Sequence, residues 1–401
     1  MKTAIFVVAA LYEDWHTAIS GHVQTSLKTA EILVKQGHEV TFITTGTPSD
    51  GRVPLPAEIS RRVGTVTIDV PMTAGGAKAP GVRAAMRLML ELRRLVRAGA
   101  FDLLHCFGGS FTAYLAGLLR ATGVRTPTLM TVVRYTRPDH RWEQVLEMVA
   151  LPRVDRFVAL CDWTRQQLVE RGIRDVFVTY PGILTQPASR PNKQIRIRAD
   201  ATDLVLFWRD ASLINGVDVC MEAFKTLSDD FPLVDFVFAV RVGHPFDDAL
   251  RKLANQYDNI HVLFFPYAKE GFAISQLIAS ASCVVLPFRS LNCDPQMAVL
   301  ETMASGAFLI TTPVGSNREV LGGYDGATLV RPADVEDTCQ AIRRALHDRE
   351  ARKSMGQNTN PDVLARWNWD GYERELMGVY RDLLGTRKTA TVGETAKSER
   401  V

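Results

Sequence analysis

The sequence predicts an α/β protein of two domains, each built on a parallel sheet with helices on both faces. Three observations support this prediction. The chain has 401 residues, too many for one ordinary core. Short apolar runs alternate with helical patterns almost throughout, which is typical of β-α-β units. Near the middle, residues 181–203 are rich in Pro and basic residues and lack apolar periodicity, as a linker would.

In the first half, residues 1–185, polar or helical segments separate apolar runs of strand length. The expected strands are 4–11, 39–45, 101–107, 126–133 and 155–161. Residues 22–37 show a helical pattern, and Gly37 suits the end of that helix. Residues 83–97 are basic and amphipathic, which favours a solvated helix face, with membrane-surface binding as the alternative.

After a linker at 186–202, the same alternation returns in residues 203–370. The expected strands are 204–208, 234–240, 260–265, 283–288 and 308–314, and the helical patterns between them are 217–227, 246–256, 274–281 and 298–305. A long amphipathic stretch, 369–384, comes last, and the polar residues 387–401 are typical of disorder.

Composition indicates a globular protein in a reducing compartment. Hydrophobic residues make up 46% of the chain and charged residues 23%, and the net charge of +3 is too small for a nucleic-acid binder that works by neutralising phosphates. The six Cys show no paired spacing, which favours free thiols over disulfides or a zinc site. The N-terminal apolar run suits a first strand, so we expect a cytoplasmic protein.

Ligands of open parallel sheets bind outside the carboxyl ends of the strands, so the candidate residues are those that follow strands. Gly21 and His22 follow the first strand, at a helix start whose N–H groups attract anions. A plain turn explains Gly21 equally well. His105 ends a strand in the first half, where it either faces a cleft or packs in the core.

In the second half, Arg209 directly follows an apolar strand, and Asn215-Gly216 lead into a helix. An Arg at a strand end can hold a diphosphate through paired, charge-assisted hydrogen bonds. Pairing with a surface carboxylate is the alternative.

Glu301 is the one carboxylate in the otherwise apolar helical pattern 298–305. Pro295 suits a first helical turn, so we expect the N–H groups of Gln296 and Met297 to point into the cleft. A buried carboxylate needs a partner. Both hydroxyls of a ribose would serve, and the alternative is a structural Glu bonded to the backbone or to an Arg.

Three motifs are absent from the sequence. It contains no GxxxxGK[ST] stretch, no DxD pair after a strand and no G-x-S-x-G elbow. Neither a P-loop enzyme, nor a metal-chelated diphosphate, nor an α/β-hydrolase is therefore indicated.

The stretch VLETMASGAFLITTPVGSNREVL, residues 299–321, resembles the donor-site signature of the retaining glycosyltransferases of family 4. These enzymes have the GT-B fold, in which two Rossmann-like parallel-sheet domains face a central cleft. KQGHEVTFIT, VDRFVALCDWTRQQLVERG with the following YPGI, NGVDVCMEAF and WNWDGYERELMGVYRDLL support the resemblance, which covers roughly residues 1–386. No single piece is specific, but the combination is.

By this resemblance, Glu301 binds the ribose of a nucleotide sugar and Arg209 grips its diphosphate. The N–H groups of Gln296 and Met297 reach the phosphates or the sugar. The first domain holds the acceptor, with Gly21, His22 and His105 on that side, and a crossover helix at 371–386 returns to it. Basic groups and helix dipoles offset the charge of the leaving diphosphate, so no metal is expected.

Two departures from the family pattern concern the donor site. The family's first glutamate falls at Cys293, and Asp294, one place along, is the predicted replacement that orients the sugar hydroxyls. The family's Lys is replaced by Asn215, a loss of about 1–3 kcal/mol unless Arg241 or Arg289 compensates.

Two further departures concern the first domain. The family's His-x-His is represented by His105 followed by Cys106 and Phe107, and its Gly-Gly by Ser20-Gly21.

The predicted function is transfer of a sugar from a nucleotide-diphosphate donor to an acceptor hydroxyl, with retention of configuration and without a metal or other cofactor. Asp294, Arg209 and His105 are the predicted catalytic residues, and Asn215 is counted among the donor-binding ones. The acceptor is a small molecule, a glycan or a lipid-linked compound. No nucleic-acid partner is expected, and membrane association is possible but not indicated. Two alternatives are a catalytically degenerate GT-B protein that acts as a binding partner and a sugar-nucleotide epimerase.

Overall fold

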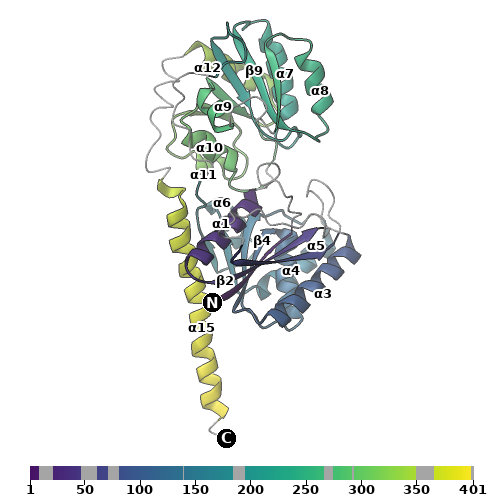
Figure 1. Cartoon of the computed structure of the whole chain (residues 1–401), viewed down its shortest axis with the longest axis vertical. Helices are drawn as coiled ribbons and strands as arrows, with labels where there is room; N and C mark the ends of the chain where they lie inside the picture. Colours follow the sequence, from purple (N-terminus) through teal and green to yellow (C-terminus); the bar gives the residue numbers. More distant parts are fainter. Residues whose placement is uncertain are drawn as a thin grey trace. The chain divides into compact units, whose positions relative to one another are not determined.

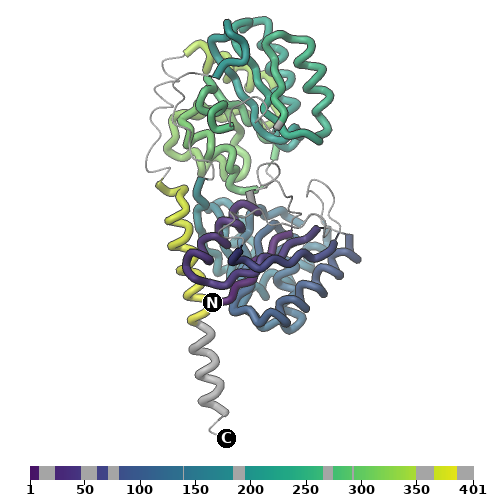
Figure 2. The backbone as a smooth tube through the Cα atoms, in the orientation of Figure 1, coloured from purple at the N-terminus to yellow at the C-terminus, as the bar shows by residue number. Residues whose placement is uncertain are grey.

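The chain forms two compact units. The computed structural model describes residues 1–8, 21–46, 61–70, 81–138, 140–183, 195–265, 274–290, 293–348 and 365–398, whose backbone is traced in Figure 2. The first unit comprises Met1–Pro181 and Trp369–Val401, and the second comprises Gly182–Asn368. The C-terminal helix therefore belongs to the first unit.

The first unit contains a seven-stranded parallel sheet of order β3-β2-β1-β4-β5-β6-β7 (Figure 1). Its strands are β1 (Lys2–Val7), β2 (Glu39–Gly46), β3 (Val63–Asp69), β4 (Leu103–Gly109), β5 (Thr128–Arg134), β6 (Arg156–Ala159) and β7 (Val176–Val178). The order reverses between β1 and β4, which is where sheets of this type bind ligands.

Helices cover both faces of this sheet because alternate strand residues point to opposite sides. Ile5 and Val7 pack with α1 and α15, whereas Ala4 and Phe6 pack with α3, α4 and α5. The helices are α1 (Gly21–Lys35), α3 (Val82–Gly99), α4 (Ser110–Ala121), α5 (Arg141–Ala150), the 3-10 helix η2 (Leu151–Arg153), α6 (Asp162–Val169) and α15 (Trp369–Ser398).

The C-terminal helix α15 supplies part of the core of the first unit. Tyr372 and Tyr380 are fully buried there. The hydroxyl of Tyr372 shares a 2.8 Å hydrogen bond with Thr29 of α1, and that of Tyr380 lies 2.7 Å from Nδ1 of His105 in β4. The predicted disordered tail, 387–401, lies beyond the residues whose side chains are described.

The second unit repeats the architecture with a six-stranded parallel sheet of order β10-β9-β8-β11-β12-β13. Its strands are β8 (Asp203–Phe207), β9 (Val234–Arg241), β10 (Ile260–Phe265), β11 (Cys283–Leu286), β12 (Leu309–Thr311) and β13 (Ala327–Leu329). Its helices are α7 (Val217–Ser228), α8 (Asp247–Ala254), α9 (Ile274–Ser280), α10 (Met297–Ala304), α11 (Asn317–Val320) and α12 (Val335–His347). The strand order of this sheet reverses between β8 and β11. The two units together confirm the prediction of two Rossmann-like parallel-sheet domains.

Three strands were not predicted: β3, β7 and β13. Each lies at the edge of its sheet and carries partly or fully exposed residues, whereas inner strands such as β4, β5 and β11 are buried almost throughout. An edge strand needs no unbroken apolar run, so the signal that revealed the central strands is missing there.

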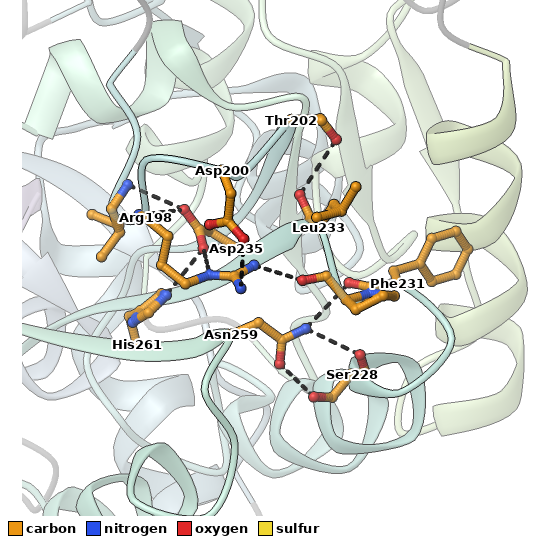
Figure 3. Close-up of polar contacts among 11 residues, drawn as sticks. Arg198, Asp200, Thr202, Ser228, Phe231, Leu233, Asp235, Asn259 and His261 are labelled. Atoms are coloured by element: carbon orange, nitrogen blue, oxygen red, sulfur yellow. Dashed lines mark hydrogen bonds and ion pairs between the residues drawn. The ribbon is translucent and has the colours of Figure 1, made fainter.

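A buried carboxylate, Asp235, joins the start of the second unit to its sheet (Figure 3). It accepts the backbone N–H groups of Ile197 and Arg198 at 3.1 Å each, Nε of Arg198 at 2.8 Å and Nε2 of His261 at 3.1 Å. Burial opposes its charge, but the hydrogen bonds from His261 and Arg198 outweigh burial and hold the pKa of Asp235 at about 2. Residues 197–198 are thereby fastened to β9.

Candidate functional site

The candidate site lies where the strand order of the second unit reverses, in the loops that follow β8 and β11. Gly216 brings these two loops together. Its φ is +74°, and a Cβ built on it would lie 2.0 Å from the carbonyl oxygen of Pro287. The carbonyl of Ile214 also accepts the N–H of Arg289 at 2.9 Å. Only glycine satisfies both the positive φ and the close approach.

Side-chain hydrogen bonds extend this contact to the loop after β12. Nε1 of Trp208 donates to Oγ1 of Thr302 in α10 at 3.4 Å. Oγ1 of Thr312 donates to the carbonyl of Phe288 at 2.7 Å, and Nδ2 of Asn317 donates to the carbonyl of Thr312 at 3.0 Å. The loops after β8, β11 and β12 therefore form one connected framework.

Several buried polar atoms on this framework have no hydrogen-bond partner among the described residues. They are Nε of Arg209, Oδ1 of Asn215, Oδ1 of Asn317, and both Oε1 and Nε2 of Gln296. The side chains of Asn215, Gln296 and Asn317 are at most 1% exposed. An unsatisfied buried polar group costs about 1–3 kcal/mol, so this concentration at one sheet edge calls for a ligand or water.

Part of this group was not predicted from the sequence. The prediction for Gln296 concerned its backbone N–H and not its side chain, and Asn317 was not among the predicted residues. The available signal was an amide just before an apolar helix, in DPQMAVLE, and another just after a strand, in VGSN.

Asn215 stands where a positive charge was expected, and the two suggested substitutes already have partners. Arg241 donates to Asp210 from Nε at 2.5 Å and from Nη2 at 2.8 Å. Arg289 forms an ion pair with Asp218. Asn215 itself donates from Nδ2 to the carbonyl of Asp210 at 2.9 Å, so it fixes the loop that carries Arg209.

Asp294 is buried and bound to the loop after β12. One of its oxygens accepts the backbone N–H of Ser316 at 3.0 Å and also the hydroxyl of Ser316. Asp294 therefore holds the start of α11 against the start of α10. Its predicted action on sugar hydroxyls stays a prediction.

Helix α10 begins at Met297, one residue before the helical pattern 298–305, with Gln296 as its N-cap. Pro295 precedes the helix rather than opening it, and the Asp294–Pro295 peptide bond is cis. Glu301 lies on the second turn of α10 and is partly exposed. Its predicted contact with a ribose stays a prediction.

His105 does not end its strand, because β4 continues to Gly109. Its side chain is fully buried, with Nδ1 2.7 Å from the hydroxyl of Tyr380 and Nε2 2.7 Å from the hydroxyl of Thr131. Burial lowers the pKa of His105 well below its usual value. The structure therefore shows the packed-core alternative, and this geometry gives no support to the catalytic or acceptor-side role predicted for His105.

The other acceptor-side candidates are only partly described. Helix α1 begins at Gly21, but residues 9–20 and the side chain of His22 lie outside the described part of the chain.

A polar cluster that the sequence did not reveal lies in the same unit. Glu147 accepts hydrogen bonds from the hydroxyls of Tyr114 at 3.2 Å and Tyr135 at 2.7 Å, and it lies 3.8 Å from Arg171. Burial and the neighbouring carboxylate raise the pKa of both tyrosines. The cluster ties α4 and α5 to the residue that follows β5.

Two family models match most of the chain between them. Residues 20–182 match the glycosyl transferase 4-like domain, and residues 190–361 match the glycosyl transferases group 1.

Curated relatives carry related names. The chain is 25% identical over 356 residues to the MMP alpha-(1->4)-mannosyltransferase of Mycolicibacterium hassiacum, an alignment that covers 83% of this chain and 82% of that protein. It is 28% identical over 158 residues to the sulfoquinovosyl transferase of Arabidopsis thaliana, which covers 38% of this chain and only 29% of that protein.

Solved structures agree on the fold. The sucrose-phosphate synthase of Thermosynechococcus elongatus superposes with a TM-score of 0.76 at 16% identity, over 96% of this chain and 99% of that one. HepE of Anabaena, solved in complex with UDP, gives a TM-score of 0.72 at 13% identity, over 95% and 100% of the two chains. At such identities the likeness shows the fold alone.

Proposed function

The chain is a glycosyltransferase of the GT-B type, and on that premise we propose that it transfers a sugar from a nucleotide-diphosphate donor to an acceptor hydroxyl with retention of configuration. The donor occupies the carboxyl edge of the six-stranded sheet, around the loops after β8 and β11. HepE of Anabaena, which has the same fold, was solved with UDP and with UDP-glucose. That likeness supports a nucleotide sugar as the donor class.

The observation that carries the proposal is the set of unpartnered polar atoms at the point where the strand order reverses. Nε of Arg209 is a donor and suits a phosphate oxygen. Oδ1 of Asn215 and of Asn317 are acceptors and suit hydroxyl groups of a sugar or a ribose. The side-chain amide of Gln296 offers a donor, Nε2, and an acceptor, Oε1. A diphosphate flanked by two polyols presents the complementary set.

In this mechanism the bond from the sugar to its diphosphate breaks while the acceptor hydroxyl attacks from the same face and gives its proton to the leaving diphosphate oxygen. Arg209 and the N-terminal end of α10, at Gln296 and Met297, offset the charge that develops on the leaving diphosphate, and no metal is required. Glu301 holds the ribose. Asp294 orients the sugar hydroxyls, in addition to its contact with Ser316.

Binding of uridine-, guanosine-, adenosine- and thymidine-diphosphate sugars tests the donor site. We expect one donor to raise the melting temperature, and the rise to be lost in Arg209→Ala and in Glu301→Ala. Arg251→Ala is the matched control, because Arg251 is an exposed Arg of α8 in the same unit whose guanidinium lies over Phe264. The site is refuted if Arg251→Ala abolishes the rise as completely as Arg209→Ala does.

Transfer is tested separately, with the donor found in this way and a panel of acceptors. Anomeric proton couplings of the product report retention or inversion, and EDTA tests the requirement for a metal. Donor binding without transfer or donor hydrolysis would instead favour a binding partner that has lost turnover.

We also place the protein in the cytoplasm. All six cysteines are free thiols, and five of them are buried. Free thiols are typical of a reducing compartment.

A further inference from the structure

Helix α3 is apolar on two separate faces. Leu88, Leu92 and Val96 are buried in the core of the first unit. Val82, Met86 and Leu90 repeat the same four-residue spacing on the solvent side, with exposed fractions of 77%, 57% and 54%. Residues four apart on a helix are neighbours, so these three side chains form a continuous stripe. The core explains the first face but not the second.

The solvent side of α3 is also strongly basic. The helix contains five arginines and a single carboxylate: Arg83, Arg87, Arg93, Arg94 and Arg97 against Glu91. With 100° between successive residues, Arg83 and Arg94 fall on the same side of the helix as Leu90. Apolar and cationic side chains therefore alternate on one surface instead of occupying opposite faces.

Helix α5 adds a second exposed apolar group on the same face of the sheet. Trp142 is 64% exposed, Val145 55% and Met148 68%, within a helix of ten residues. Helices α3, α4 and α5 all pack into one core cluster, and α4 contacts both of the others (Figure 1). Half of the large hydrophobic side chains that are exposed in the described residues, seven of fourteen, lie on α3 and α5.

We propose that the exposed faces of α3 and α5 dock the protein on an anionic lipid bilayer. Apolar side chains such as Met86, Leu90 and Trp142 enter the boundary between headgroups and acyl chains, and the exposed Arg83 and Arg94 beside them bind the lipid phosphates. Each basic residue near an anionic surface strengthens the binding. The binding is peripheral, and no helix in the described part of the chain is long and apolar enough to span a membrane.

Charge favours a bilayer over a second copy of this chain. Two copies that met through α3 would bring together ten arginines and only two glutamates, and like charges repel at such an interface. An anionic lipid surface offers the complementary charge together with an apolar layer. The proposal does not depend on the donor chemistry, because the residues that carry it lie in the other unit.

Co-sedimentation of the full chain with vesicles tests the proposal. We expect binding to vesicles of phosphatidylcholine and phosphatidylglycerol, little binding to phosphatidylcholine alone, and weakening with salt. Met86→Gln/Leu90→Gln and Arg83→Gln/Arg94→Gln should each lower the partition coefficient about tenfold or more. Leu233→Gln is the matched control, because Leu233 is 49% exposed but belongs to the second unit, and it should leave binding unchanged.

Two further measurements make the test decisive. Thermal unfolding should be unchanged in all these variants, since the substituted side chains are exposed or partly exposed. Brominated acyl chains should quench tryptophan fluorescence, and less so in Trp142→Phe. The proposal is overturned if the wild type does not bind anionic vesicles or binds neutral vesicles equally well. It is also overturned if sedimentation velocity shows a dimer that Met86→Gln/Leu90→Gln dissociates.

Discussion

The substitution Gly216→Ala tests whether the contact between the loops after β8 and β11 builds the candidate site. The new methyl group would face two penalties. A left-handed backbone costs a non-glycine residue about 1–2 kcal/mol. The Cβ would also lie 2.0 Å from the carbonyl oxygen of Pro287, a backbone atom that cannot rotate away. Overpacking of this kind costs about 1–3 kcal/mol. We therefore expect a loss of about 2–5 kcal/mol in the free energy of unfolding.

Gly243→Ala provides the matched control. Gly243 also has a positive φ, +95°, and belongs to the same unit, but no atom lies within 4 Å of a Cβ built there. Gly243→Ala should lower the free energy of unfolding only by the cost of the left-handed backbone, about 1–2 kcal/mol. The difference between the two variants isolates the close approach at Pro287.

Urea unfolding followed by circular dichroism measures both losses, and thermal shift with the donor measures binding. Gly216→Ala should also weaken donor binding, because displacement of Pro287 moves the loop that leads to Gln296. Gly243→Ala should not. Equal losses of stability in the two variants, or full donor binding by Gly216→Ala, would refute the argument.

Three further predictions concern stability and reactivity. The pKa of Asp235 is held at about 2, below its usual 3.8, so its charge should stabilise the fold by about 2 kcal/mol above pH 5. That contribution should fade as the pH falls below 4 towards 2. The free energy of unfolding of Asp235→Asn, measured against pH, should lack this loss between pH 4 and 2. The same pH dependence in Asp235→Asn as in the wild type would contradict the prediction. Tyr380→Phe removes the hydroxyl that meets Nδ1 of buried His105, so it should cost about 1–3 kcal/mol, measured by urea unfolding, whereas a loss under 0.5 kcal/mol would show that the contact is unimportant. Among the six thiols only that of Cys293 is partly exposed, and burial raises the pKa of Cys106, Cys220 and Cys339. A thiol reagent at pH 8 should therefore modify Cys293 first in the native protein and all six after unfolding, and mass spectrometry that found Cys106 modified as fast as Cys293 would refute this.

Part of the candidate site was predictable because loops of parallel sheets carry functional residues at fixed places. Arg209 was predicted because it directly follows an apolar run, and Asn215 and Gln296 because they stand where helices begin, with the family resemblance in support. All three supply polar atoms without a partner at the edge where the strand order reverses. His105 was predicted to end its strand, but β4 continues to Gly109 and the His105 side chain is fully buried. The edge strands β3, β7 and β13 escaped prediction because half-exposed strands carry no continuous apolar signal.

The sequence by itself determined the α/β class, the division into two parallel-sheet domains and the central strands. These follow from local patterns, because a strand buried on both faces must be apolar along its length. Only the tertiary structure decided which polar groups have partners. Arg241 is bound to Asp210, His105 to a tyrosine 275 residues away, and Asp294 to Ser316. Such partners come from distant parts of the chain, and no local pattern states which side chains the fold will bring within hydrogen-bond distance.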